Sequence, residues 1–413
     1  MGGHPTRRLC RFLRPRPSRV AAALLVALAA AWLAACGGIP VPDTGPGSGS
    51  DDEEGSRPSP PPPPPRRATL LSVGDIFLHD SLLQAGRDPA TGNYDFRPFL
   101  DPVRDTIRTA DLAVANLETP VAGKAAGYSG YPLFNAPDAL LEALRDAGFD
   151  VLTNANNHSL DRGARGLIRT YESLDRFGFV HTGTARSPAE RDRVAMVEVN
   201  GVRIAFTAYT YGTNGIPLPE PHMVNLIDEE RIAADVARAR QAGADLVSVS
   251  LHFGNEYQPE PSPEQERLVE AALDSGADII LGHHPHVLQR AELRDGKAVL
   301  FSQGNFLCGQ IGEDRMTSAL FWLDIEKDVT TGRAAVTGIR FEPVYIHKAR
   351  IAGRLVWRPL PAAAAARDPA RYGVPPGDVP VLERAFRRAV ERLEAPGVQL
   401  NGSREAVASR QAL

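Results

Sequence analysis

The stretch DIILGHHPH (residues 278–286) decides the fold: it is a run of apolar residues that ends in three histidines. The helical pattern 263–276 precedes it and closes at Gly276, a residue type favoured just past the end of a helix. Two earlier segments, DVLTNANNH (150–158) and DLVSVSLHFGNE (245–256), share this plan. In each, an acidic residue leads into an apolar strand that ends in a polar cluster. Repetition of helix, glycine and strand predicts an α/β fold.

Outward from these three segments, the same alternation extends from residue 68 to residue 302. Apolar runs predict strands at 68–73, 111–116, 149–154, 244–250, 277–282 and 297–302, and amphipathic patterns predict helices at 137–148, 163–178, 229–243 and 263–276. Asn200-Gly201 predicts the two-residue turn of a hairpin over 196–206. Residues 319–346 predict a later antiparallel pair. A mixture of parallel and antiparallel strands indicates two sheets.

Polar side chains gather where the predicted strands end. The strand ends carry Asp75, Glu118, Asn157 with His158, His252, and His284 with His286. In α/β sheets, ligands bind at the carboxyl ends of the strands, so we expect these side chains to converge on one site. Of the ten histidines, five lie at three of these ends. Mixed Asp, Glu, Asn and His ligands suit Mn²⁺, Fe or Zn²⁺, and two such ions would activate a water for hydrolysis.

Strand parity separates neighbouring candidates. In an extended segment His284 and His286 project to one side and His283 to the other, which favours the first two as ligands and gives His283 a supporting role. Asn116 and Glu118 likewise share one face. Glu118 is the better ligand, and Asn116 could orient it or contact substrate.

Six ordered motifs now carry a resemblance to a known family. VGDIFLHD (73–80), NLE (116–118), NNHSLDRG (156–163), HFGNEY (252–257), GHHPHVLQ (282–289) and SQGNF (302–306) resemble the motif series of the CapA family. These are bacterial poly-γ-glutamate capsule synthesis proteins related to the calcineurin-like metallophosphoesterases. The resemblance spans roughly residues 68–310. It implies a four-layer α-β-β-α sandwich with a two-metal centre between the sheets.

The resemblance also implies roles for individual residues. It implies metal ligation by Asp75, which would also bridge the ions, by His286 on the first ion, and by Asn157, His252 and His284 on the second. His158 matches the general acid that protonates the leaving oxygen.

Two departures from the phosphoesterase pattern bear on activity. Phe77 stands where those enzymes usually carry a histidine, and His79 lies four positions after the Asp. Asn-Leu-Glu replaces the usual Gly-Asp-x-x-Asp. Glu118 is therefore expected to be a ligand because its carboxylate can bind a metal, and not because the family motif marks this position. These changes weaken the expectation of phosphatase activity more than that of the fold.

Three further candidates each keep two interpretations. Asp161 fits the family pattern or caps the following helix. Glu256 lines the pocket or packs beside it. Asn305 orients a ligand or caps a turn.

The N-terminus has the pattern of an export signal. Six arginines precede the apolar stretch 20–36, which ends in Leu-Ala-Ala-Cys. This resembles a bacterial lipoprotein signal, with a peptide 1–35 removed and Cys36 lipidated. The alternative is an uncleaved membrane anchor. Both place the rest of the chain on the extracytoplasmic face of the cell membrane. Residues 36–67 are rich in Pro, Gly and Ser and predict a disordered stalk.

The net charge and the number of cysteines limit the kinds of partner and of disulfide structure that are expected. The formal net charge is −4, from 46 basic and 50 acidic residues; without the six leader arginines it is −10, from 40 basic and 50 acidic residues. Nucleic acid is therefore not an expected partner. Three cysteines are too few for a disulfide framework.

The expected partners are the membrane, through the lipid, and an anionic envelope polymer such as poly-γ-glutamate, with membrane subunits of a polymer synthase beside them. Metal and local arginines would have to offset the repulsion of a polyanion.

The expected organisation is a catalytic domain over 68–347 and a C-terminal extension over 348–413 with one amphipathic helix, near 381–395. The function predicted for this domain is metal-dependent hydrolysis of a phosphoester or an amide in capsule or envelope polymer synthesis. A non-catalytic component that binds the polymer for assembly or export is the alternative.

Overall fold

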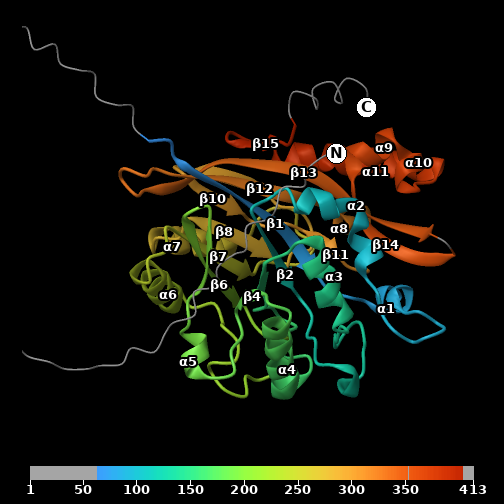
Figure 1. Cartoon of the computed structure of the whole chain (residues 1–413), viewed down its shortest axis with the longest axis horizontal. Helices are drawn as coiled ribbons and strands as arrows, with labels where there is room; N and C mark the ends of the chain where they lie inside the picture. Colours follow the sequence, from blue (N-terminus) through green and yellow to red (C-terminus); the bar gives the residue numbers. More distant parts are fainter. Residues whose placement is uncertain (1–62, 352, 403–413) are drawn as a thin grey trace, which may run out of the picture. The chain divides into compact units, whose positions relative to one another are not determined.

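Two β-sheets lie face to face and carry helices on their outer surfaces (Figure 1). This computed structural model describes residues 63–351 and 353–402. The expected signal peptide, Cys36 and nearly all of the stalk lie outside these residues. Within the described part of the chain, no helix has both the length and the apolar character needed to cross a bilayer.

The first sheet has nine strands within the described residues. Seven lie in the order β14 (Arg354–Pro361), β13 (Ala334–Ile351), β12 (Thr317–Lys327), β1 (Arg66–Ile76), β2 (Leu112–Leu117), β3 (Val151–Thr153) and β4 (Val180–Thr182), while β11 (Asn305–Leu307) pairs with β1 and β15 (Val398–Leu400) with β13. Strands β1 to β4 are parallel, and β12 to β14 are antiparallel. The predicted later antiparallel pair is β12 with β13.

The second sheet contains six strands in the same part of the chain. Their order is β5 (Ala195–Val199), β6 (Val202–Thr210), β7 (Leu246–His252), β8 (Ile279–His283), β10 (Lys297–Leu300) and β9 (Ala291–Arg294). The β5–β6 hairpin turns at Asn200 and Gly201, which both have positive φ, 51° and 77°, as a two-residue turn of this kind requires. This confirms the predicted hairpin.

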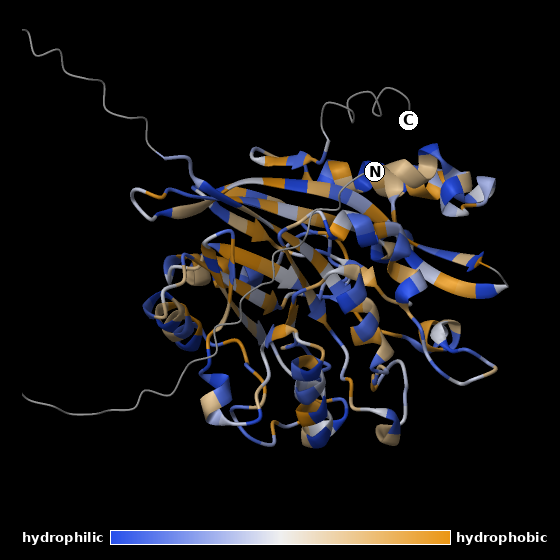
Figure 2. Ribbon diagram, viewed as in Figure 1, coloured by the Kyte–Doolittle hydropathy of each residue, from blue (hydrophilic) through white to orange (hydrophobic). Residues whose placement is uncertain are grey.

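Side-chain alternation along the strands builds three apolar layers. Leu70 on β1 faces the second sheet and packs in a core with Ile204 and Leu281. Leu71, the next residue, faces the opposite way into a core with helices of the outer face. On the far side of the second sheet, Val249 packs in a third core beneath two helices. Figure 2 shows apolar residues concentrated along the strands. The arrangement is the four-layer α-β-β-α sandwich that the motifs implied.

Helices cover the two outer faces and connect the strands. They are α1 (Asp80–Gly86), α2 (Arg97–Ile107), α3 (Ala139–Ala147), α4 (Gly163–Arg176), α5 (Pro188–Arg191), α6 (Glu229–Gln241), α7 (Pro263–Asp274), α8 (Glu313–Met316), α9 (Ala362–Arg367), α10 (Pro369–Tyr372) and α11 (Val379–Leu393), with 3-10 turns η1 (Lys124–Ala126) and η2 (Pro376–Asp378). Five of these are predicted helices, namely α3, α4, α6, α7 and α11. α7 begins at a capping box between Ser262 and Gln265.

The expected domain boundary at residue 347 is wrong in position, because it falls inside β13. Beyond it, β14 and β15 both pair with β13, and α11 packs its buried residues Leu382, Phe386 and Leu393 into the cores. Residues 348–402 therefore complete the first sheet. The repeated helix–glycine–strand pattern does not extend to this antiparallel region, so it gave no signal there.

Two glycines let the chain pass close behind the ends of two strands. A Cβ on Gly74, next to Asp75, would lie 1.8 Å from the carbonyl oxygen of Gly304. A Cβ on Gly282, next to His283, would lie 1.9 Å from that of Phe301. Backbone atoms cannot yield as a flexible side chain does, so both positions require glycine.

Gly282→Ala should therefore lower the free energy of unfolding by about 1–3 kcal/mol through this clash. Gly377→Ala is the matched control, since a Cβ there meets nothing within 4 Å and the backbone needs no left-handed φ. Urea unfolding measures both. Equal stability of the two variants would contradict the close approach at Gly282.

Candidate metal centre

The polar clusters at the five strand ends meet in one place. Asp75 lies on β1, Glu118 follows β2, Asn157 and His158 follow β3, His252 ends β7, and His284 and His286 follow β8. All seven side chains are buried. The first sheet thus supplies the carboxylates and the amide, and the second sheet supplies the remaining histidines. This convergence is the arrangement expected from the sequence.

Asp75 is held by four nitrogen groups. Its Oδ1 accepts a hydrogen bond from Asn116 Nδ2 at 2.8 Å and lies 2.9 Å from His283 Nδ1. Its Oδ2 accepts from the backbone N–H of His284 at 3.2 Å and lies 3.3 Å from His286 Nδ1. Burial alone would raise the pKa of Asp75, but the bonds from His283 and His286 outweigh it and hold this pKa well below the usual range. Asp75 is therefore a fixed anion.

Glu118 is the opposite case. Its Oε1 lies 3.4 Å from His252 Nε2 and 3.8 Å from His286 Nε2. Both carboxylate oxygens are buried and have no hydrogen-bond partner among the described residues. Burial raises the pKa of this carboxyl to about 8. A buried carboxyl group without partners is costly, and a cation beside it would remove that cost.

The histidine segment is not extended, as the parity argument assumed. β8 ends at His283, and His284 and His286 have positive φ values of 94° and 58°. Side-chain alternation along a strand therefore does not explain where His284 and His286 point. Their contacts nevertheless differ from those of His283, as expected. His283 bonds to Asp75, while His284 Nδ1 is buried without a partner and its ring centroid is 4.9 Å from that of His252.

His252 and His286 are each oriented by an amide. His252 Nε2 lies 2.8 Å from Asn157 Oδ1, and Asn157 Nδ2 donates to Asn214 at 3.2 Å. His286 Nδ1 lies 2.9 Å from Asn305 Oδ1. Asn305 thus orients a candidate ligand, the first of its two interpretations. Burial alone would lower the pKa of His286, but Glu118 and Asp75 outweigh it and raise this pKa to about 9.

These residues suit a divalent metal. Three groups of potential ligand atoms converge within the described chain: Asp75 with Glu118 and His286, Glu118 with His252 and His284, and Glu256 with His284 and His286. The mixture of imidazole and carboxylate is the donor set of Mn, Fe and Zn sites. The unpartnered atoms of Glu118 and His284 are those that a cation would engage. Glu118 is common to two groups, whereas the resemblance implied Asp75 as the bridge.

His158 stands apart from these groups and forms a pair with Asp161. Its Nδ1 lies 2.7 Å from Asp161 Oδ2, which also accepts the backbone N–H of Phe134 at 2.7 Å. The Phe134 ring packs edge-on against His158 at 4.6 Å. α4 begins at Arg162 without a side-chain cap, so Asp161 orients His158 and does not cap the helix. The pair engages Nδ1 of His158 and fixes the orientation of its ring.

His79 is not placed among the candidate ligands. Its Nδ1 accepts the backbone N–H of Gly309 at 3.2 Å, and its ring packs on Phe77 and Phe134. Burial lowers its pKa to about 4. Phe77, at the usual histidine position, packs its ring 5.1 Å from that of His286. Asn116 bonds to Asp75 and not to Glu118 as expected, and its Nδ2 also lies 3.4 Å from His252 Nδ1.

Two tyrosines lie at the centre; Tyr257 follows Glu256 in the motif HFGNEY and was expected either to line the pocket or to pack beside it, whereas Tyr211 was not predicted. Tyr211 is 51% exposed and its ring lies 4.6 Å from that of His284. Tyr257 is 44% exposed and lies 6.3 Å from His286. Glu256, beside Tyr257, is exposed and contributes to a ligand group. Both tyrosines are in irregular segments, where no periodicity marks a side chain that faces a site.

Comparison with known proteins adds three findings. The family model of the bacterial capsule synthesis protein PGA_cap matches residues 69–310. The chain is 31% identical over 255 residues to the capsule biosynthesis protein CapA of Bacillus anthracis, covering 59% of this chain and 60% of that protein. It is 33% identical over 262 residues to the PGA biosynthesis protein CapA of Bacillus subtilis, covering 61% and 65%. The alignments thus span less than two thirds of either relative.

A solved structure with a related arrangement is the calcineurin-like phosphoesterase YfkN from Bacillus subtilis. It is 15% identical, with a TM-score of 0.43, and the alignment covers 78% of this chain and 99% of that one.

Adding Mn²⁺, Fe²⁺ or Zn²⁺ to chelator-treated protein should raise its melting temperature. A ligand at a hundredfold excess over its Kd stabilises the folded state by about 2.7 kcal/mol. Glu118→Gln should lose most of this shift, whereas Glu264→Gln, at an exposed position on α7, should keep it. Differential scanning fluorimetry with elemental analysis measures both effects. A full metal response in Glu118→Gln would contradict a site built around this carboxylate.

Proposed function

Because the chain belongs to the bacterial capsule synthesis protein PGA_cap family, we propose that it is a metal-dependent hydrolase acting on poly-γ-glutamate or a precursor of it. Two relatives named for capsule and PGA biosynthesis support the polymer connection. We further propose that a lipid on Cys36 anchors the protein to the extracytoplasmic face of the cell membrane, beside the membrane subunits of the polymer synthase.

The observation that carries the proposal is the pairing of two chemically different sites. One is the group of buried ligand atoms around Glu118, whose carboxylate has no hydrogen-bond partner within the described residues. The other is His158, buried beside this group and held by Asp161. A structural cluster needs no such unpartnered carboxylate. Hydrolysis needs both a bound cation and a proton donor.

The residues that would hold two divalent ions are Asp75, Glu118, Asn157, His252, His284 and His286, with Glu256 at the edge. Bound there, the ions would supply an activated water and polarise the bond to be cleaved. His158 holds a proton at Nε2 and delivers it to the leaving atom. Asp161 keeps the imidazole in the required orientation.

The exposed residues at the centre would bind the substrate. Tyr211 and Tyr257 offer ring faces to its apolar parts and hydroxyl groups to its polar ones. Arg162 donates to the backbone carbonyls of Leu133 and Phe134 and has no carboxylate partner among the described residues. The bond to be cleaved is then a γ-glutamyl amide or a phosphoester of a precursor.

A non-catalytic role in polymer binding and export is the second candidate. The observation in its favour is Phe77, an apolar ring packed against His286 where phosphoesterases usually carry a histidine. On this view the centre holds ions that bind polymer carboxylates. Polymer export by cells would then survive loss of His158.

His158→Ala should reduce turnover by about 100-fold or more, because general acid catalysis contributes roughly that factor, while the metal content stays unchanged. His181→Ala is the matched control, since His181 pairs with Asp175 in the same way outside the ligand groups. Turnover is measured with γ-glutamyl amides, phosphomonoesters and phosphodiesters on metal-loaded protein. Unchanged turnover in His158→Ala would exclude the proposed acid. Export that survives this change would favour the second candidate.

A further inference from the structure

The segment 211–216, which follows β6, makes a tight turn with left-handed backbone at its tip. The tip residues, Asn214 and Gly215, have φ values of 51° and 76°. The backbone N–H of Ile216 donates to the carbonyl of Thr213 at 2.9 Å and closes the turn. Glycine and asparagine adopt this backbone more readily than other residues. The turn therefore has a defined shape, from which the Asn214 side chain projects.

Contacts at both ends of this turn hold it against the metal centre. At one end the backbone N–H of Tyr211 donates to the carbonyl of His252 at 3.0 Å. At the other end Ile216 packs in an apolar cluster with Leu160, which lies three residues after Asn157. The turn is thus fixed to two of the chain segments that supply candidate ligands of the second ion.

The two ends of the Asn157 amide have different partners. Its Oδ1 lies 2.8 Å from Nε2 of His252, itself a candidate ligand, and its Nδ2 donates to Asn214 Oδ1 at 3.2 Å. Only the oxygen of an amide serves as a metal ligand, because the nitrogen carries two hydrogens and donates. Asn214 therefore engages the donor end of the amide, while the oxygen end stays beside the histidine.

The turn covers these ligands from the outside. Asn157 is buried, whereas Asn214 is exposed, so the Asn214 side chain can be changed without opening the core. The Tyr211 ring is stacked on that of His252 at 6.4 Å and lies 4.6 Å from that of His284. Partial burial raises the pKa of Tyr211, and a hydrogen bond with Asn157 acts against this rise. Two side chains of one turn thus contact the Asn157 amide.

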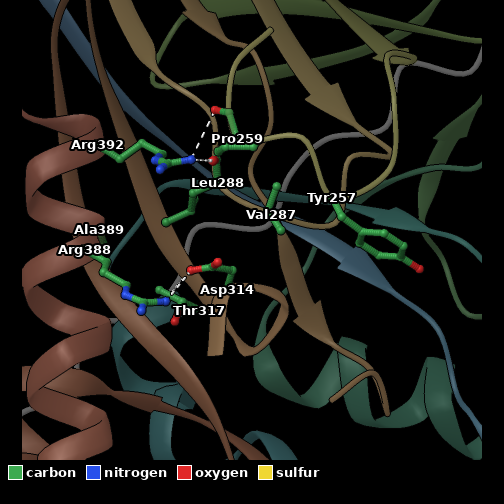
Figure 3. Close-up of a pocket in the computed structure, with 9 residues that line it drawn as sticks. All are labelled: Tyr257, Pro259, Val287, Leu288, Asp314, Thr317, Arg388, Ala389 and Arg392. Atoms are coloured by element: carbon green, nitrogen blue, oxygen red, sulfur yellow. Dashed lines mark hydrogen bonds and ion pairs between the residues drawn. The ribbon is translucent and has the colours of Figure 1, made fainter. Parts of the chain in front are cut away.

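A pocket near His286 differs from this turn. Tyr257, whose ring lies 6.3 Å from that of His286, lines this pocket beside α11 (Figure 3). In it Arg388 pairs with Asp314 at 2.6 Å, and Arg392 donates to two backbone carbonyls, both at 3.1 Å. The charged groups drawn there bind one another or the backbone, whereas the side chain of the turn binds a candidate ligand.

We propose that Asn214 is a positioning residue that holds the Asn157 amide with its oxygen toward a cation bound beside His252. This inference rests on the metal centre of the proposed function, but it concerns how one of two ions is held and not which bond is cleaved. Residues that orient metal ligands typically change metal affinity by about 10–100-fold. Water can replace part of the contact of the exposed Asn214, so the expected effect is near the lower end of this range.

The other ion would be held without help from the turn. Of its implied ligands, Asp75 Oδ1 lies 2.9 Å from His283 Nδ1, and His286 Nδ1 lies 2.9 Å from Asn305 Oδ1. Neither of these supporting residues belongs to the segment 211–216. Removal of the Asn214 side chain should therefore weaken one of two metal-binding steps and leave the other unchanged.

The test measures metal binding and not turnover. The full chain in detergent, freed of metal with a chelator, is dialysed to equilibrium against Mn²⁺ or Zn²⁺, and elemental analysis gives the ions bound per chain. Asn214→Gly removes the side chain without straining the backbone, because glycine adopts a positive φ readily. It should weaken one binding step about tenfold. Asn214→Asp should keep this step at least as strong, because a carboxylate accepts from Asn157 Nδ2 in the same way.

Asn200→Gly is the matched control, at the opposite end of β6. Asn200 has the same φ of 51°, is also followed by a glycine, and donates to the carbonyl of Arg67 at 3.1 Å. Both binding steps should be unchanged in this variant, and melting curves without metal check that all three variants are folded. Unchanged binding in Asn214→Gly, an equal loss in Asn200→Gly, or a tenfold loss in Asn214→Asp would each overturn the proposal. So would a chain that binds neither metal.

The two proposals fail in different ways. Metal binding that changes as predicted, without hydrolysis of any substrate, would remove the hydrolase and leave the role of Asn214. Hydrolysis together with unchanged metal binding in Asn214→Gly would remove the role of Asn214 and leave the hydrolase.

Discussion

The buried carboxylate of Glu118 is the constraint on which the centre depends. Transfer of a carboxyl group into a protein interior without hydrogen bonds costs several kcal/mol, and more if it is ionised. Asp75 avoids this cost through its four nitrogen partners, whereas the oxygens of Glu118 accept no hydrogen bond from the described residues and have only the more distant His252 and His286 beside them. A fold that keeps such a group between two sheets keeps it for a cation. The neighbouring histidines lie where they could bind the same cation as Glu118.

The two sheets make this arrangement possible because each brings a different kind of ligand. Parallel strands of the first sheet end in Asp75 and Glu118, and those of the second end in His252 and the histidine segment. Close passage of the chain behind Gly74 and Gly282 allows both sets to approach. The apolar core between the sheets fixes their separation. The precision of the centre is therefore a property of the whole sandwich and not of its loops.

Much of this could be predicted from the sequence because it rests on local patterns. Apolar runs, amphipathic helices and the glycines that follow them gave the strands and their order. The polar residues that follow each strand gave the site. The left-handed backbone at His284 and His286 could not be predicted in this way, because non-glycine residues seldom adopt it and tertiary contacts impose it. Which ligand atoms form a group depends on distances between residues of two sheets. The strands after residue 347 pair with distant residues and lack the repeated pattern.

The centre has a rigid part, formed by the buried ligands around Glu118, and an open part, formed by the exposed Tyr211 and Tyr257 beside them. Catalysis requires ligands that are fixed in position and shielded from water. The buried residues around Glu118 meet that requirement.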